Sequence, residues 1–263
     1  MVKIRYFFIF NFFLLFLLLE LLFFPLLLVY IVLLLLLTDY ENNILVQYLI
    51  IIPVVYLIGS IPWGFMLTKI VKGIDIRDYG SGSMGMSNVF RVQGVKIAIP
   101  VFLLDMTKGM LATFFAKIIS DNDPGLISIA SIVAISGHIW PIFLGFKGGK
   151  GIAIGVGTAS VIWPPFWIIG IGSFVVILLL TKYISLASLV GTLAVTMLGV
   201  ILVFFDIKLS LFDPNFQYIH LVYFVGTFIL LFWAHRENLL RLMNRNERKI
   251  GDSEPKTKNR NGN

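Results

Sequence analysis

The sequence contains no cysteine, and only three of its 263 residues are histidine, at positions 138, 220 and 235. A chain without cysteine forms no disulfide and offers neither a thiolate nucleophile nor a thiolate ligand for a metal. Three histidines provide few nitrogen ligands for a metal centre. We therefore expect no metal and no cofactor.

Charged residues are also scarce: they make up 13% of the chain, whereas hydrophobic residues make up 58%. Soluble domains carry about 25% charged residues. Together with a mean hydropathy of +0.93, this composition predicts an integral membrane protein. Because a helix pairs its own backbone groups within lipid, we expect an all-α fold, a polytopic bundle of transmembrane helices.

Eight apolar stretches are candidates for membrane helices. They span residues 6–37, 47–68, 97–119, 126–144, 152–163, 165–180, 185–205 and 218–234. We interpret the first as a retained anchor, because its apolar run is too long for an ordinary signal peptide. The stretches 152–163 and 165–180 are short for a crossing and meet at Pro164-Pro165, so they form either one kinked helix or two helices.

The distribution of charge favours two helices here, and eight crossings in all. With a cytoplasmic N-terminus, the inner segments carry 18 of the 21 Lys and Arg residues, and the outer connections carry only Lys208 and six acidic residues. Positive charge collects on the cytoplasmic side of membrane proteins. The basic excess therefore indicates an inner membrane face and not a nucleic-acid site.

Glycine-rich, hydroxyl-bearing and basic strips fall on this inner side. They are YGSGSMGMSNVFR at 79–91, GFKGGKG at 145–151, YISLAS at 183–188 and HRENLLR at 235–241. In GFKGGKG, glycine N–H groups can surround an oxyanion that Lys150, together with Lys147, neutralises. A simpler interpretation stays open, in which these lysines only orient the membrane segments.

Nucleotide-binding motifs do not account for these strips. Gly80, Gly82 and Gly85 have the spacing of a dinucleotide fingerprint, but they lie in a loop of a membrane protein and not between a strand and a helix. GFKGGKG has neither the spacing of a Walker A motif nor its Ser or Thr. The strips thus predict a phosphate site without predicting a nucleotide.

Ionisable residues also interrupt the apolar stretches. Asp105 and Lys108 are three residues apart on a predicted helix, so they can neutralise each other. We interpret His138, near the inner end of its helix, as an interfacial anchor.

Five strips occur in order along the chain: GSIPWG at 59–64, GIDIRDYGSGSMGMSNVFR at 73–91, GHIWPIFLGFKGGKG at 137–151, YISLAS at 183–188 and HRENLLRLMNRNERKIG at 235–251. In these strips the chain resembles PlsY, the bacterial family of acyl-phosphate-dependent glycerol-3-phosphate acyltransferases. The resemblance runs from about Tyr48 to Gly251. Ser83, Met86 and Ser87 stand where the family has Asn, Ala and Thr.

The resemblance implies seven family helices, to which this chain adds an N-terminal segment. We expect residues 1–46 to form this extra membrane segment with its outer loop, residues 47–251 the acyltransferase domain, and residues 252–263 a disordered basic tail. The implied location is the bacterial cell membrane, with the active site on the cytoplasmic face.

The implied reaction transfers a fatty acyl group from acyl phosphate to the 1-hydroxyl of sn-glycerol 3-phosphate and gives lysophosphatidic acid and phosphate. Membrane lipids, the two substrates and a functional link to the enzyme that makes acyl phosphate follow from the same resemblance. Its site residues fall into three groups: phosphate ligands, supporting residues, and catalytic residues around the glycerol and the reacting carbonyl. They are Ser81, Arg91 and Lys150; Ser87, Asn88 and Lys147; and Ser188, His235 and Asn238.

A membrane transporter for a phosphorylated metabolite is the alternative, since broken helices and inner-face cations also suit the passage of an anion. No inverted repeat is apparent in the sequence, and the basic strips all face one side. These two observations favour the enzyme.

Overall fold

The structure is a computed structural model that describes residues 43–206 and 217–252. Within these ranges it contains helices and no strand, which confirms the all-α class. The helices are α2 (Ile44–Ser60), α3 (Trp63–Lys72), α4 (Met86–Gln93), α5 (Val95–Ile119), α6 (Pro124–Ile139), α7 (Ile152–Ile162), α8 (Pro165–Thr181), α9 (Ile184–Phe204), α10 (His220–Ala234) and α11 (Arg236–Met243), with short 3-10 turns η2 (Ile76–Asp78) and η3 (Ile142–Leu144). The predicted segment 6–37 and residues 253–263 of the predicted tail lie outside the described residues.

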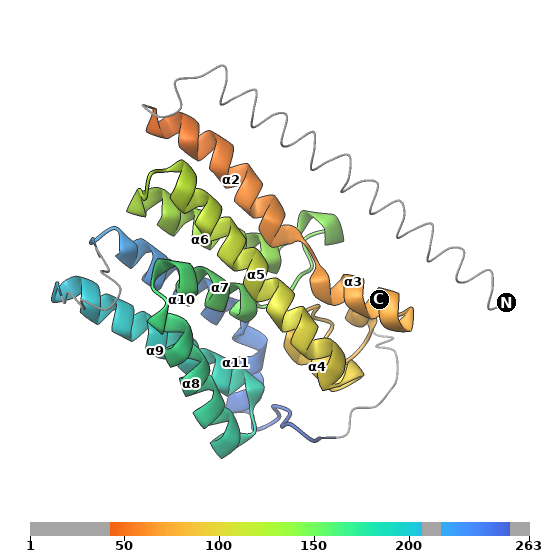
Figure 1. Ribbon diagram of the computed structural model, residues 1–263. Helices are drawn as coiled ribbons and strands as arrows, with labels where there is room; N and C mark the ends of the chain where they lie inside the picture. The colour runs from red at the N-terminus through yellow and green to blue at the C-terminus, as the bar shows by residue number, and fades with distance from the viewer. Residues whose placement is uncertain (1–42, 207–216, 253–263) are drawn as a thin grey trace.

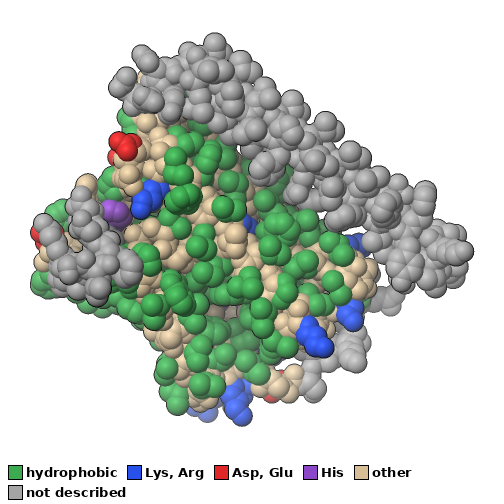
Figure 2. Space-filling model, viewed as in Figure 1, with side chains coloured by type: hydrophobic (Ala, Val, Ile, Leu, Met, Phe, Trp, Pro, Cys, Tyr) green, Lys and Arg blue, Asp and Glu red, His purple; other side chains and the backbone are tan. Residues whose placement is uncertain are grey.

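The described helices are apolar enough for a membrane bundle. Four spans have the length and composition of a crossing, namely Ile44–Lys72, Val95–Ile119, Pro124–Leu144 and Ile184–Phe204, and α7, α8 and α10 are shorter apolar helices. Leu179 and Leu180 on α8 are each 76% exposed, as expected of side chains that face lipid. Figure 2 shows a largely hydrophobic face, with Lys and Arg mainly along its lower right edge. The number of crossings stays a prediction.

The stretch around Pro164 forms two helices and not one kinked helix. α7 ends at Ile162, Trp163 has an extended backbone, and α8 begins at Pro165. Proline suits the first turn of a helix, where its missing N–H is not needed. Because the two helices separate here, α7 packs against α5 while α8 packs against α9.

Glycines allow two pairs of helices to approach each other closely. A Cβ at Gly59 on α2 would lie 2.0 Å from the carbonyl oxygen of Ala134 on α6, and Gly137 on α6 lies similarly close to the backbone of α2. Gly109 on α5 and Gly157 on α7 form the same kind of reciprocal contact. Membrane helices use small residues in this way. The contacts fix the end of α6 and the start of α7, and thereby the loop 145–151 between them.

Figure 1 shows how the bundle is arranged, with α2, α6 and α5 side by side and α8 beside α9. The short helices α4 and α11 carry two of the predicted strips. α4 packs against α5, and α11 packs against α9 and α10. The strips thereby come together at one end of the bundle, although they are far apart in the sequence.

Candidate active site

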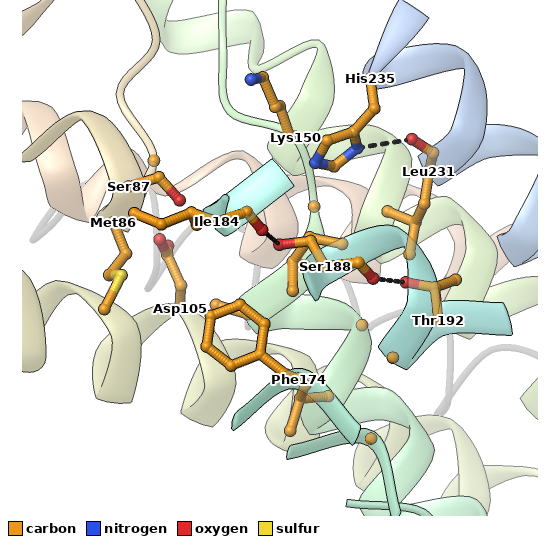
Figure 3. Close-up of a pocket in the computed structure, with 18 of the residues that line it drawn as sticks. Met86, Ser87, Asp105, Lys150, Phe174, Ile184, Ser188, Thr192, Leu231 and His235 are labelled. Atoms are coloured by element: carbon orange, nitrogen blue, oxygen red, sulfur yellow. Dashed lines mark hydrogen bonds between the residues drawn. The ribbon is translucent and has the colours of Figure 1, made fainter. Parts of the chain in front are cut away.

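A cavity of about 300 Å³ lies among the helices from α4 to α11 and has two chemically different ends. Polar residues of its lining include Ser81, Arg91, Lys150, His235 and Asn238, and apolar residues include Phe102, Phe166, Phe174, Val195 and Phe224. Figure 3 shows this division, with Lys150 and His235 at one end and Phe174 toward the other. Such a cavity suits a molecule with an anionic head and a hydrocarbon tail.

Eight of the nine predicted site residues line this cavity: Ser81, Ser87, Asn88, Arg91, Lys150, Ser188, His235 and Asn238. The exception is Lys147, whose side chain is exposed on the loop that carries Lys150. Its contribution to phosphate binding stays a prediction, and the structure supplies a natural comparison between a half-buried and an exposed lysine of one loop.

The loop 145–151 is held to α6 by its backbone. The N–H of Gly149 donates to the carbonyl of His138 at 3.0 Å, and that of Gly148 donates to Ile139 at 3.2 Å. Gly151 then begins α7 with a φ of +85°, a conformation that a residue with a Cβ rarely adopts. The glycines therefore turn the chain so that Lys150 reaches the cavity.

Lys150 is the central cation of the polar end. Its Nζ donates to Oδ1 of Asn238 on α11. Burial, together with repulsion from Arg241 and Arg91, lowers the pKa of Lys150 to about 8. A nearby anion favours the charged form of a lysine, so this side chain is prepared to bind phosphate.

The strip 79–91 is shaped by Asn88, which is buried. The Oδ1 of Asn88 accepts from the N–H of Ser81 at 2.9 Å, and its Nδ2 donates to the carbonyls of Tyr79 and Ser83 at 3.0 and 2.7 Å. An amide side chain has two donor hydrogens and one acceptor oxygen, so the backbone occupies these groups. In this structure Asn88 organises the strip, and its predicted direct support of substrate stays a prediction.

The departure from the family at Ser83 has a local consequence. The hydroxyl oxygen of Ser83 accepts from the N–H of Gly85 at 3.2 Å, just before α4 begins. Serine, like asparagine, supplies an oxygen that can accept such a bond. The replacement therefore keeps a side-chain acceptor at this turn.

His235 joins α10 to α11 and is buried. Its Nδ1 lies 2.8 Å from the carbonyl oxygen of Leu231, which is an acceptor only, so Nδ1 carries the proton and donates. Burial, with repulsion from Lys150, lowers the pKa of His235 to about 4. The ring is therefore neutral near pH 7, and its Nε2 can accept a proton or a hydrogen bond. Figure 3 shows the ring between Leu231 and Lys150.

Ser188 lies on α9 opposite the strip 79–91 and is also buried. Its hydroxyl donates to the carbonyl of Ile184 at 2.9 Å, and the hydroxyl of Thr192 donates to the carbonyl of Ser188 at 2.9 Å, as Figure 3 shows. A serine hydroxyl still has acceptor capacity after donating one bond. Ser188 can therefore receive a hydrogen bond from a hydroxyl in the cavity.

Glu247 was missed by the sequence analysis. Its Oε1 accepts from Ser185 at 2.8 Å and from Asn238 at 2.7 Å, its Oε2 accepts from Nε of Arg241 at 2.9 Å, and Arg91 lies 4.0 Å away. Burial opposes ionisation, but the hydrogen bonds from Asn238, Ser185 and Arg241 hold the pKa of Glu247 below its usual range. A carboxylate within a run of cations was the only signal in the sequence.

The sequence and fold are similar to those of known proteins. Residues 49–245 match the family described as glycerol-3-phosphate acyltransferase. The glycerol-3-phosphate acyltransferase of Pelagibacter ubique is 41% identical over 204 residues, which cover 78% of this chain and 98% of that protein. That of Acholeplasma laidlawii is 39% identical over 210 residues, covering 74% of this chain and 90% of the relative.

Two crystal structures of PlsY, an integral membrane glycerol 3-phosphate acyltransferase, have a similar fold. The glycerol 3-phosphate form has a TM-score of 0.69 and 30% sequence identity, and the match covers 78% of this chain and 96% of that one. The lysophosphatidic acid form has a TM-score of 0.68 and 29% identity, covering 78% and 95%. The shared fold places this chain among multi-pass membrane proteins.

Proposed function

Because the chain belongs to the glycerol-3-phosphate acyltransferase family, we propose that it transfers a fatty acyl group from acyl phosphate to the 1-hydroxyl of sn-glycerol 3-phosphate. The products are lysophosphatidic acid and inorganic phosphate. The observation that carries the proposal is the cavity itself, in which Lys150 and Arg91 lie at one end and a hydrophobic wall at the other. This arrangement and the family match favour an acyltransferase over a transporter.

Acyl phosphate suits the residues of the polar end. It is a mixed anhydride with a good leaving group, so the protein need only position the substrates and stabilise charge. The glycerol oxygen forms a bond to the carbonyl carbon while the bond from that carbon to the phosphate oxygen breaks. Lys150 and Arg91 neutralise the phosphate groups.

The proton of the glycerol hydroxyl leaves with the departing phosphate, either directly or through Nε2 of His235. The neutral state of His235 supports the second route, because an imidazole must be unprotonated to accept a proton. Ser188 and Asn238 hold the hydroxyl and the carbonyl in place. Glu247 orients Asn238 and Arg241 through its hydrogen bonds.

The active site faces the cytoplasm in this proposal. All the strips that form the polar end lie on the side with most of the Lys and Arg residues, and positive charge is retained on the cytoplasmic side. The acyl chain then lies among α8, α9 and α10, at the depth of the bilayer, while glycerol 3-phosphate enters from water.

The test is a donor comparison with purified protein. Acyl phosphate, acyl-CoA and acyl-carrier protein are each incubated with glycerol 3-phosphate, and lysophosphatidic acid and released phosphate are measured. We expect both products, in equal amounts, from acyl phosphate. Product only from acyl-CoA or acyl-carrier protein would contradict the donor, and no product from any of the three would contradict the reaction.

A further inference from the structure

Three ionisable side chains are buried together inside the bundle. Asp105 and Lys108 lie on α5 and His138 lies on α6, and none is more than 2% exposed. His138 is therefore not the interfacial anchor that the sequence suggested. Asp105 and His138 also line the cavity, and Figure 3 shows Asp105 on the same side of it as Met86 and Ser87. Ionisable groups at this depth are costly, and they commonly serve function.

Lys108 is at the centre of this group. Its Nζ lies 2.8 Å from Oδ1 of Asp105, 3.0 Å from Nδ1 of His138 and 2.6 Å from the carbonyl oxygen of Ile61. An ammonium group has three hydrogens and no acceptor, so when Lys108 is charged Nδ1 of His138 accepts from it, and Nδ1 also lies 3.5 Å from Oδ1 of Asp105. The proton of the neutral imidazole is therefore on Nε2, the opposite side of the ring.

The Nε2 side of His138 packs against the loop that carries Lys150. A Cβ at Gly149 would lie 2.0 Å from Nε2 of His138, and the N–H of Gly149 donates to the carbonyl of the same histidine at 3.0 Å. The ring and the backbone of His138 thus both hold the residue next to Lys150. A movement of the ring would move the loop.

Through its contact with Ile61, Lys108 is also connected to the strip 79–91. Ile61 lies at the break between α2 and α3, where its carbonyl oxygen accepts from the N–H of Trp63 at 3.2 Å. Lys108 supplies a second donor to this carbonyl. Directly after the break, a Cβ at Gly64 would lie 1.8 Å from the carbonyl oxygen of Met84, so α3 packs tightly against the strip 79–91.

We propose that Asp105, Lys108 and His138 form a positioning triad that holds the loop 145–151 and the strip 79–91 at the separation that a substrate phosphate requires. Asp105 neutralises Lys108, so this buried lysine does not compete with Lys150 for the anion. The triad itself contacts no reacting atom. Its loss therefore raises KM for glycerol 3-phosphate more than it lowers kcat. The inference rests on the proposed function, since it names the substrate whose phosphate is held.

A matched pair of substitutions at His138 in the full-length protein tests the triad. Asparagine presents its oxygen near the position of Nδ1, where it can accept from Lys108, whereas glutamine presents its polar group near Nε2. We expect His138→Asn to keep KM for glycerol 3-phosphate within about threefold and His138→Gln to raise it about ten- to a hundredfold, the scale expected when groups are displaced by about 1 Å. Equal KM values in the two variants would overturn the proposal.

A pair of substitutions that leaves the net charge unchanged distinguishes an effect on substrate positioning from an effect on folding. Lys108→Met alone leaves Asp105 as an unpaired buried charge, and we expect a lower Tm. The double variant Asp105→Asn with Lys108→Met removes both charges, so we expect a Tm near that of the wild type and a KM raised as in His138→Gln. A folded double variant with unchanged KM would overturn the triad.

A binding measurement tests the triad without relying on catalytic turnover. The rise in Tm caused by glycerol 3-phosphate requires no turnover, and we expect it to be smaller in the double variant than in the wild type. Equal rises would contradict the triad even if the donor assay succeeds. Absence of product in that assay, with these differences in Tm intact, would contradict only the proposed reaction.

Discussion

Lys150, in the loop just before α7, donates a hydrogen bond to Asn238 on α11, which is 88 residues later in the chain. Asn238 in turn donates to Glu247. This chain of contacts connects the cation to a buried carboxylate without an ion pair between the two. The first two predictions concern Lys150.

Lys150→Ala is expected to lower kcat/KM for glycerol 3-phosphate about ten- to a hundredfold. A charge-assisted hydrogen bond contributes about 1.5–3 kcal/mol, and about 1.4 kcal/mol corresponds to a tenfold change in rate. Lys150→Arg should recover little, because a forked guanidinium does not replace a compact ammonium among closely packed glycines. Lys147→Ala, on the exposed part of the same loop, is the comparison and should lower kcat/KM less than Lys150→Ala, because the side chain of Lys147 is exposed to solvent. Near wild-type kcat/KM in Lys150→Ala would refute a phosphate contact.

The affinity for glycerol 3-phosphate should depend on pH through Lys150. With a pKa of about 8, the lysine is mostly charged at pH 7 and loses its proton as the pH rises. If phosphate binds the charged lysine, KM should rise about tenfold per pH unit well above pH 8. Below about pH 6 a separate rise is expected from protonation of the substrate phosphate, whose second pKa is about 6. Steady-state kinetics from pH 6 to 10 measure this, and a flat profile would argue against Lys150 as the titrating group.

Glu247→Gln provides the matched test of that assignment. Glu247 raises the pKa of Lys150, so removing its charge should move the rise in KM to lower pH. In neither protein should the titration of His235 change KM near pH 6.5, because the pKa of His235 is about 4. A profile that does not move in Glu247→Gln would show that this carboxylate does not influence the lysine.

Residues 1–42 should be dispensable for the reaction. The family match begins at residue 49, and Asn43 caps α2 by accepting from the N–H groups of Leu45 and Val46. A protein that begins just before Asn43, with a new initiator methionine, should insert and turn over glycerol 3-phosphate at a rate near that of the full-length protein. Loss of activity in a folded, inserted truncation would assign the N-terminal segment to the site.

The orientation in the membrane can be measured with single cysteines, since the chain has none of its own. Lys147 is exposed beside the site, and Tyr218 is 71% exposed at the start of α10. In intact cells an impermeant thiol reagent should label Tyr218→Cys but not Lys147→Cys, and in inverted vesicles the result should be reversed. External labelling of Lys147→Cys would contradict a cytoplasmic site.

The sequence predicted the helical class, because hydropathy marks membrane segments. Its resemblance to a known family pointed to eight residues that the structure brings to one cavity, and their roles stay predictions. It did not predict the role of Asn88, whose hydrogen bonds depend on how its own loop folds. Glu247 and His138 were harder still. The contacts of Glu247 and His138 depend on how separate segments of the chain pack together, and the spacing of residues along one segment contains no information about such packing.

The contact between Lys150 and Asn238 also constrains the order in which the site is completed during synthesis. Lys150 leaves the ribosome long before Asn238 and Glu247, which follow α10. A nascent chain that ends before α11 therefore has its cationic loop but lacks the groups that orient it. On the proposed function, the phosphate site is completed only after α10 has been inserted and α11 has followed it, so an unfinished chain in the membrane has no assembled anion site.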